Sequence, residues 1–168
     1  TTVQTLIKNL EQDRIIRVMP NIPCLISEGI SLVYLTDNIE KSENSFIINQ
    51  LEFVSKVIVV QKESKIDEYI GISASGPAYI FELARILSTK ASQLGLPEEE
   101  AISMVNQMIY GSAKLLKDSN ESAELLRNKV TSKKGVTFEA LKILKESRLE
   151  AAFNAAIDKT IERSKELN

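Results

Sequence analysis

The stretch from Pro77 to Leu94 constrains the fold most strongly, because it predicts a helix that is apolar on almost every side. Its apolar positions are 78, 80, 81, 83, 84, 86, 87, 91 and 94, and they cover well over half of a helical circumference. Such a helix is stable only when most of its surface is buried. One short chain offers too little helical surface for this, so we expect two copies to pack together. A tight single-chain bundle is the alternative.

Every segment after about residue 64 predicts helix, and the boundaries carry recognisable signals. Ser75-Gly76-Pro77 is a start signal, because proline suits the first turn of a helix. Gly95 and Pro97 separate this helix from the next one, whose acidic first turn suits the helix dipole. The predicted helices cover residues 66–72, 77–94, 97–117, 122–129, 137–145 and 149–165.

Residues 1 to about 62 have a different sequence pattern, in which short β-branched runs alternate with helical patterns. Pro20, Pro23 and Gly29 mark the loop after the first predicted strand. Strands are predicted at residues 15–19, 30–35 and 56–60, and helices at 3–10 and 44–54. The predicted fold class is therefore mostly α, with a helical domain preceded by a few α/β elements.

Composition excludes several classes of function. Lys and Arg total 21 against 23 for Asp and Glu, which gives a net charge of −2 and argues against a nucleic-acid-binding protein. The absence of histidine rules out histidine zinc sites and Ser-His-Asp triads, and no metal site is expected. Cys24 is the only cysteine, so no intrachain disulfide is expected and a reducing cytoplasm is the natural location. No apolar run reaches the ~18 residues of a membrane span, so no membrane partner is expected.

VTSKKGVT, from Val130 to Thr137, is a candidate anion site. It lies at the start of a predicted helix, where free backbone N–H groups and the helix dipole attract anions. Lys133 and Lys134 add positive charge, Gly135 permits unusual backbone angles, and Thr137 offers a helix cap or a hydroxyl donor. A solvated surface turn explains the same residues equally well.

Three other stretches carry candidate chemistry, each with a structural alternative. RVMPNIP (17–23) is a strand followed by a rigid loop, which lines a ligand crevice in some α/β sheets and is a plain strand exit in others. SASGPAY (73–79) suits close backbone approach to a ligand or another chain, although an ordinary helix start explains it better. Glu63, Asp67 and Glu68 favour a dipole interaction over a catalytic pair. Neither nucleotide-binding fingerprint, GxGxxG or GxxxxGK[ST], occurs in the chain.

Five segments resemble, in this order, the pyrroline-5-carboxylate reductase family: RVMPNIPCLISEG, SASGPAY, LGLPEEEA, LRNKVTSKKGVTFEALKILKE and AAIDKTIERSKEL. The resemblance implies that residues 1–63 are the C-terminal part of a dinucleotide-binding, Rossmann-like domain. It implies that residues 64–168 form an all-helical domain for dimerisation and substrate binding. It further implies an interlocked homodimer, assembled into larger rings in some members, and the NAD(P)H-dependent reduction of 1-pyrroline-5-carboxylate to proline.

The resemblance also implies roles for individual residues. Thr137 is expected to be catalytic, with its hydroxyl near the ring nitrogen, and the amides of residues 135–137 are expected to hold the substrate carboxylate. Glu63 matches an acidic position near the substrate, ten residues before SASGPAY. The residues expected at the substrate are Glu63, Lys129, Thr131, Ser132, Gly135, Val136 and Thr137, and those expected beside the nicotinamide are Met19, Pro20 and Asn21.

The chain departs from the family pattern most clearly within the turn. Lys133 and Lys134 stand where the family has proline and glycine, and Ile22 and Ala74 replace a threonine and a glycine. These changes leave two alternatives: a catalytically impaired paralogue kept for assembly, or a reductase for a different cyclic imino acid. The glycine-rich part of the nucleotide domain is expected before Thr1 in the full-length form. This chain alone is therefore expected to bind NAD(P)H weakly and to be inactive.

Overall fold

The computed structural model describes residues 1–167 and contains two compact units. The first, called the sheet unit, comprises Thr1–Tyr79 and the segment that begins at Asn154. The second, called the helical unit, comprises Ile80–Phe153. The boundary between the units falls within two helices, and the domain boundary predicted between residues 63 and 64 stays a prediction.

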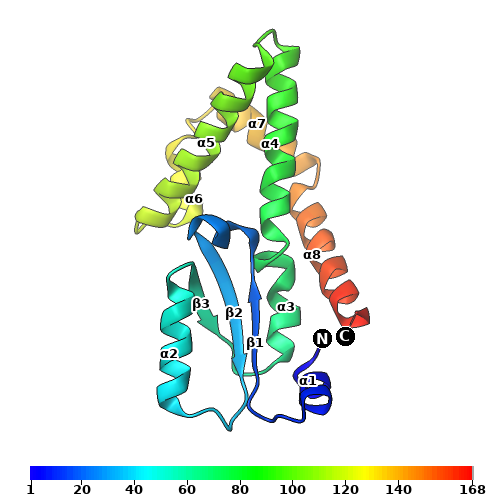
Figure 1. Ribbon diagram of the computed structural model, residues 1–168. Helices are drawn as coiled ribbons and strands as arrows, with labels where there is room; N and C mark the ends of the chain where they lie inside the picture. Colours follow the sequence, from blue (N-terminus) through cyan, green and yellow to red (C-terminus); the bar gives the residue numbers. More distant parts are fainter. Residues whose placement is uncertain (168) are drawn as a thin grey trace. The chain divides into compact units, whose positions relative to one another are not determined.

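The sheet unit is built on three strands in the order β1 (Ile16–Pro20), β2 (Gly29–Leu35) and β3 (Ser55–Val59) (Figure 1). β1 pairs antiparallel with β2, from Ile16 opposite Leu35 to Pro20 opposite Ser31. β2 pairs parallel with β3, and α2 (Lys41–Glu52) makes the crossover that a parallel pair requires. A short 3-10 helix, η1 (Ile22–Ile26), follows β1.

Helices lie on either side of this sheet, with α2 against β3 and α3 (Ser64–Ser73) against β1 and β2 (Figure 1). Leu32 on β2 and Ile66 on α3 are almost fully buried and form the core with Val60. Met19 and Tyr34 pack against this cluster. The burial of both faces of β2 explains its nearly continuous apolar sequence. α1 (Val3–Leu10) precedes β1 and begins at Thr2, whose hydroxyl caps it.

The C-terminal part of α8 (Leu149–Glu166) packs against α3. Gly71 permits this approach, because a Cβ at that position would lie 3.1 Å from Cγ2 of Ile157. Ser164 Oγ donates a hydrogen bond of 3.0 Å to Oδ1 of Asp67 one turn earlier on α3. α8 therefore brings the C-terminal part of the chain back to the sheet unit, beside α3.

The helical unit contains most of α4 (Gly76–Gln93), then α5 (Glu98–Asp118), α6 (Ala123–Lys129), α7 (Val136–Glu146) and the start of α8. Gly95 lies in the turn between α4 and α5 and has a φ of +102°, a value that suits glycine. None of the residues of α4, all of which the structure describes, is buried. Phe81 is 59% exposed and Ile86 is 49% exposed. The prediction that α4 carries more apolar surface than one chain covers is confirmed.

The predicted helices and strands all occur, with boundaries that differ by a few residues. α2 begins three residues earlier than predicted, because Glu40 and Glu43 form a capping box. α7 begins at Val136 with Gly135 as its cap, so Thr137 is the second helical residue and the interpretation of Thr137 as a cap is wrong. Within residues 1–167, no helix has the length and apolar character needed to cross a bilayer.

Candidate functional site

The turn between α6 and α7 is closed by its own backbone and by one side chain. The Thr131 hydroxyl donates to the Arg127 carbonyl at 2.7 Å, so it is engaged in ending α6. The Gly135 N–H donates to the Ser132 carbonyl at 2.9 Å. Of the three amides predicted to hold a carboxylate, that of Gly135 therefore serves the turn itself.

Lys134 adopts the left-handed backbone conformation, with a φ of +61°. For a residue with a Cβ, this conformation costs roughly 1 kcal/mol or more, whereas glycine adopts it without this cost. In the sequence pattern that this turn resembles, glycine occupies the position of Lys134. The turn therefore keeps a backbone that suits the glycine although lysine occupies the position.

The first turn of α7 presents three backbone N–H groups, those of Val136, Thr137 and Phe138, that donate to no acceptor in the described part of the chain. No side chain caps this helix end. Unused amides at the positive end of a helix dipole form an anion-binding site. Val136 is 89% exposed, so the amides lie at an open surface.

Lys133 and Lys134 are exposed and make no ion pair with any residue that the structure describes. Lys129 differs from them, because its ammonium group contacts both carboxylate oxygens of Glu121 at 2.5 and 2.6 Å. A substrate anion would have to compete with Glu121 for Lys129. The two lysines of the turn are free to meet an added negative charge.

Glu63 takes part in a buried ion-pair network of the sheet unit. Its Oε1 accepts a hydrogen bond from the Val3 N–H at 2.7 Å and another from Nη1 of Arg17 at 2.8 Å. Nη2 of Arg17 donates to Oδ1 of Asp67 at 3.0 Å. The Arg17 side chain is only 9% exposed. Glu63 therefore connects α1 to β1 and α3, and its role at a substrate stays a prediction.

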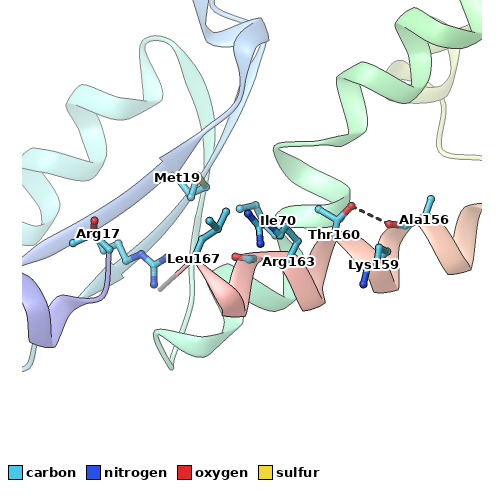
Figure 2. Close-up of a pocket in the computed structure, with 10 residues that line it drawn as sticks. Arg17, Met19, Ile70, Ala156, Lys159, Thr160, Arg163 and Leu167 are labelled. Carbon is cyan, nitrogen blue, oxygen red and sulfur yellow. Dashed lines mark hydrogen bonds between the residues drawn. The ribbon is translucent and has the colours of Figure 1, made fainter.

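The loop after β1 holds the other predicted residues. The Asn21 side chain joins two elements: its Oδ1 accepts from the Ile30 N–H at 2.9 Å and its Nδ2 donates to the Ser73 carbonyl at 3.0 Å. Pro20 is exposed at the end of β1. Met19 is half-buried and borders a pocket of about 630 Å³ (Figure 2). Asn21 therefore shapes the loop, and Met19 and Pro20 have side chains available to a ligand.

The predicted residues thus form one set within the sheet unit (Met19, Pro20, Asn21 and Glu63) and another within the helical unit (Lys129 to Thr137). Sequence reasoning missed Arg17 and the pocket. The sequence contains one indication of Arg17, which is a lone charge inside the apolar run IIRVM. It contains no indication of the pocket, because the pocket walls come from segments far apart in the sequence. Among residues 1–167, no group of three or more His, Cys, Asp or Glu is placed to hold a metal ion.

Comparison with known proteins adds independent evidence. Residues 63–167 match the pyrroline-5-carboxylate reductase dimerisation family. The chain is 31% identical over 168 residues to pyrroline-5-carboxylate reductase of Escherichia coli K12, covering 99% of this chain and 62% of the relative. It is 31% identical to the Arabidopsis thaliana pyrroline-5-carboxylate reductase, covering 94% of this chain and 56% of the relative.

Solved structures show the same likeness. The structure of a pyrroline-5-carboxylate reductase from Coxiella burnetii matches with a TM-score of 0.93 and 33% identity, over 99% of this chain and 62% of that one. The Plasmodium falciparum pyrroline carboxylate reductase, solved with NADP bound, matches with a TM-score of 0.88 and 26% identity, over 96% of this chain and 65% of that one. The chain thus spans under two thirds of the length of these relatives. By sequence, by fold and by its match to the dimerisation domain, the chain belongs to the pyrroline-5-carboxylate reductase family.

Proposed function

We propose that the full-length protein catalyses the NAD(P)H-dependent reduction of 1-pyrroline-5-carboxylate to proline, the last step of proline biosynthesis. Family membership supports this proposal. The structural observation that carries it is the turn before α7, which leaves three amides free in spite of the two lysines. A planar imino acid with one carboxylate suits such a group of donors.

The proposed chemistry transfers a hydride to the carbon of the protonated imine, whose nitrogen has taken its proton from water. The C=N double bond becomes a C–N single bond, and the nitrogen is then the amine of proline. The reduced nicotinamide, when bound, supplies the hydride and becomes oxidised. The chain's own task is to hold the ring still, since positioning alone lowers the barrier to such a transfer substantially. In this proposal the amides of Val136 to Phe138 hold the carboxylate, and the Thr137 hydroxyl hydrogen-bonds near the ring nitrogen.

The residues of this chain fit a dinucleotide only in part. Met19 and Pro20 offer an apolar edge for a nicotinamide ring, and Asn21 fixes the loop that carries them. The sequence contains no GxGxxG stretch, so nothing in it matches the usual cradle of the pyrophosphate. We therefore propose that the full-length protein, and not this chain alone, binds NAD(P)H.

We further propose that the protein is a homodimer formed through its helices. The match to a dimerisation family and the exposed apolar side chains of α4 and α5 support this assembly. A cytoplasmic location, with neither nucleic acid nor a membrane as partner, is consistent with one cysteine and a net charge of −2. Sedimentation at micromolar concentration tests the dimer, and a monomer there would refute it.

The decisive activity test follows NAD(P)H oxidation by the full-length protein when 1-pyrroline-5-carboxylate is added. The Thr137→Val variant removes the hydroxyl, and Thr137→Ser is its control because it keeps the hydroxyl. We expect Val to lower kcat/KM by about 10- to 100-fold and Ser to retain most of the activity. A well-folded full-length protein that oxidises no NAD(P)H would end the proposal.

One observation favours a second candidate, a reductase for a cyclic imino acid with an additional anionic group. Lys133 and Lys134 have no acidic partner in the part of the chain that the structure describes. A second carboxylate on the substrate would meet these two charges. Comparing kcat/KM for cyclic imino acids with one and two carboxylates separates the candidates. If the substrate with two carboxylates has the higher kcat/KM, the Lys133→Gln variant should reduce the ratio between the two values.

A further inference from the structure

The pocket beside Met19 lies entirely within the sheet unit, and it has the size of a small-molecule site. Its volume is about 630 Å³, within the range of roughly 300–1,000 Å³ that ligand pockets span. β1, α3 and the C-terminal part of α8 contribute its walls. Met19, Ile70, Ala156 and Leu167 give these walls an apolar character (Figure 2).

Among the described residues that line this pocket, three have cationic side chains, Arg17, Lys159 and Arg163, and none is acidic. Thr1, the first residue of the chain, also lies on its wall. Arg17 is already neutralised, because its two terminal nitrogens donate to Glu63 and Asp67. The side-chain charge available to a ligand therefore comes from Lys159 and Arg163.

Lys159 and Arg163 are four residues apart on α8, so their side chains leave the same face of the helix. Lys159 pairs with Glu162 at 2.7 Å and Arg163 pairs with Glu166 at 2.6 Å. All four side chains are at least 47% exposed, and exposed pairs of this kind stabilise a protein very little. An incoming anion can replace either acid at small cost.

The hydroxyl groups at the pocket are already donors to the protein. Thr160 Oγ1 donates to the Ala156 carbonyl at 2.9 Å (Figure 2), and Ser164 Oγ donates to Asp67 at 3.0 Å. Recognition of an anion therefore falls to the two basic side chains. Because none of the described lining residues is acidic, a ligand ammonium would meet no carboxylate among them, which disfavours zwitterionic amino acids.

We propose that this pocket binds small organic anions that carry an apolar body and no positive charge. The body packs against Met19, Ile70 and Leu167, and a carboxylate or phosphate head binds Lys159 and Arg163. This inference shares only Met19 with the proposed reductase site, because Ile70, Lys159, Arg163 and Leu167 have no role in that site.

The test is a residue-resolved NMR titration of the isotopically labelled 168-residue chain with four probes. Hexanoate and hexyl phosphate carry the proposed body with each of the two head groups. Hexylamine has the same body with the opposite charge, and inorganic phosphate is a head without a body. We expect the amide signals of Ile70 and Ala156 to shift with hexanoate or hexyl phosphate, and to stay unchanged with the two control probes. Their relative affinities decide between the carboxylate and the phosphate head.

A matched pair of variants identifies the recognising charge. Arg163→Gln removes a pocket cation, whereas Arg85→Gln removes an arginine of α4 that is equally exposed, at 63%, and also paired across i,i+3. We expect Arg163→Gln to raise the Kd of the bound probe about 5-fold, and Arg85→Gln to leave it unchanged. Equal shifts with hexylamine, an absence of shifts at the pocket with both anions, or an unchanged Kd in Arg163→Gln would each overturn the proposal.

Discussion

Replacing Lys134 with glycine should stabilise the protein, and the same change at Lys133 should destabilise it. Lys134 has a φ of +61°, whereas Lys133 does not have a positive φ. Both residues are exposed, and each substitution removes one lysine of the same turn, so the loss of charge is matched. The backbone conformation is the difference between them.

The magnitudes follow from two opposing contributions. The left-handed conformation costs a residue with a Cβ about 1–2 kcal/mol, and glycine avoids this cost. Glycine in turn destabilises the folded state by roughly 0.5–1 kcal/mol, because it loses more conformational entropy on folding. We therefore expect Lys134→Gly to raise the free energy of unfolding by about 0.5–1 kcal/mol, and Lys133→Gly to lower it by a similar amount.

Urea unfolding followed by circular dichroism, at one fixed protein concentration, measures both variants against the parent chain. A fixed concentration is needed because any dimer links stability to protein concentration. The two neighbouring variants should differ by about 1–2 kcal/mol. Equal destabilisation by both substitutions would show that the backbone of Lys134 is not strained, and would refute the expected gain in stability of Lys134→Gly.

Three further predictions concern the sheet unit. Arg17→Met should lower the free energy of unfolding by about 3–5 kcal/mol in the same urea assay, because two carboxylates would lose the cation buried between them; a loss below about 1 kcal/mol would contradict the burial of this network. Gly29→Ala should prevent stable folding or shift η1, because a Cβ there would lie 2.8 Å from the Cys24 backbone nitrogen; an unchanged urea midpoint would disprove the close approach. The pKa of Glu43 lies below its ordinary value because it accepts a hydrogen bond from Arg14, so its small stabilisation is present at neutral pH and is lost as pH falls through the folded-state pKa. Arg14→Gln should return that pKa, measured by NMR titration, toward the ordinary value, and no change would refute the assigned cause.

Some features of the candidate site could be predicted from the sequence, and others could not. The turn, its lysines and its helix were all predicted from the sequence, because a turn and a helix start are local features. The sequence did not reveal that Gly135 uses its own N–H to close the turn, which moves the free amides to Val136, Thr137 and Phe138. Hydrogen-bond geometry over a few residues decided this, and residue types alone do not specify it.

In the sheet unit, too, the family resemblance predicted site residues but not their contacts. It identified Glu63 as a substrate-binding acid, and the structure shows this carboxylate accepting hydrogen bonds from Arg17 and Val3. It grouped Asn21 with the nicotinamide loop, and both ends of the Asn21 amide hold neighbouring elements together. Neither contact contradicts a ligand-binding role, but both give these residues a structural task that no motif expresses.

The sequence by itself determined the helices and strands, the excess of apolar surface on α4 and the family to which the chain belongs. These properties depend on residue periodicity, on glycine and proline, and on short motifs, all of which act over a few residues. The tertiary structure decided the ion-pair network and the pocket. Arg17 meets Asp67 across 50 residues, and Asp67 meets Ser164 across 97. Such contacts depend on how the chain returns to itself, so they become visible only when β1, α3 and α8 pack together.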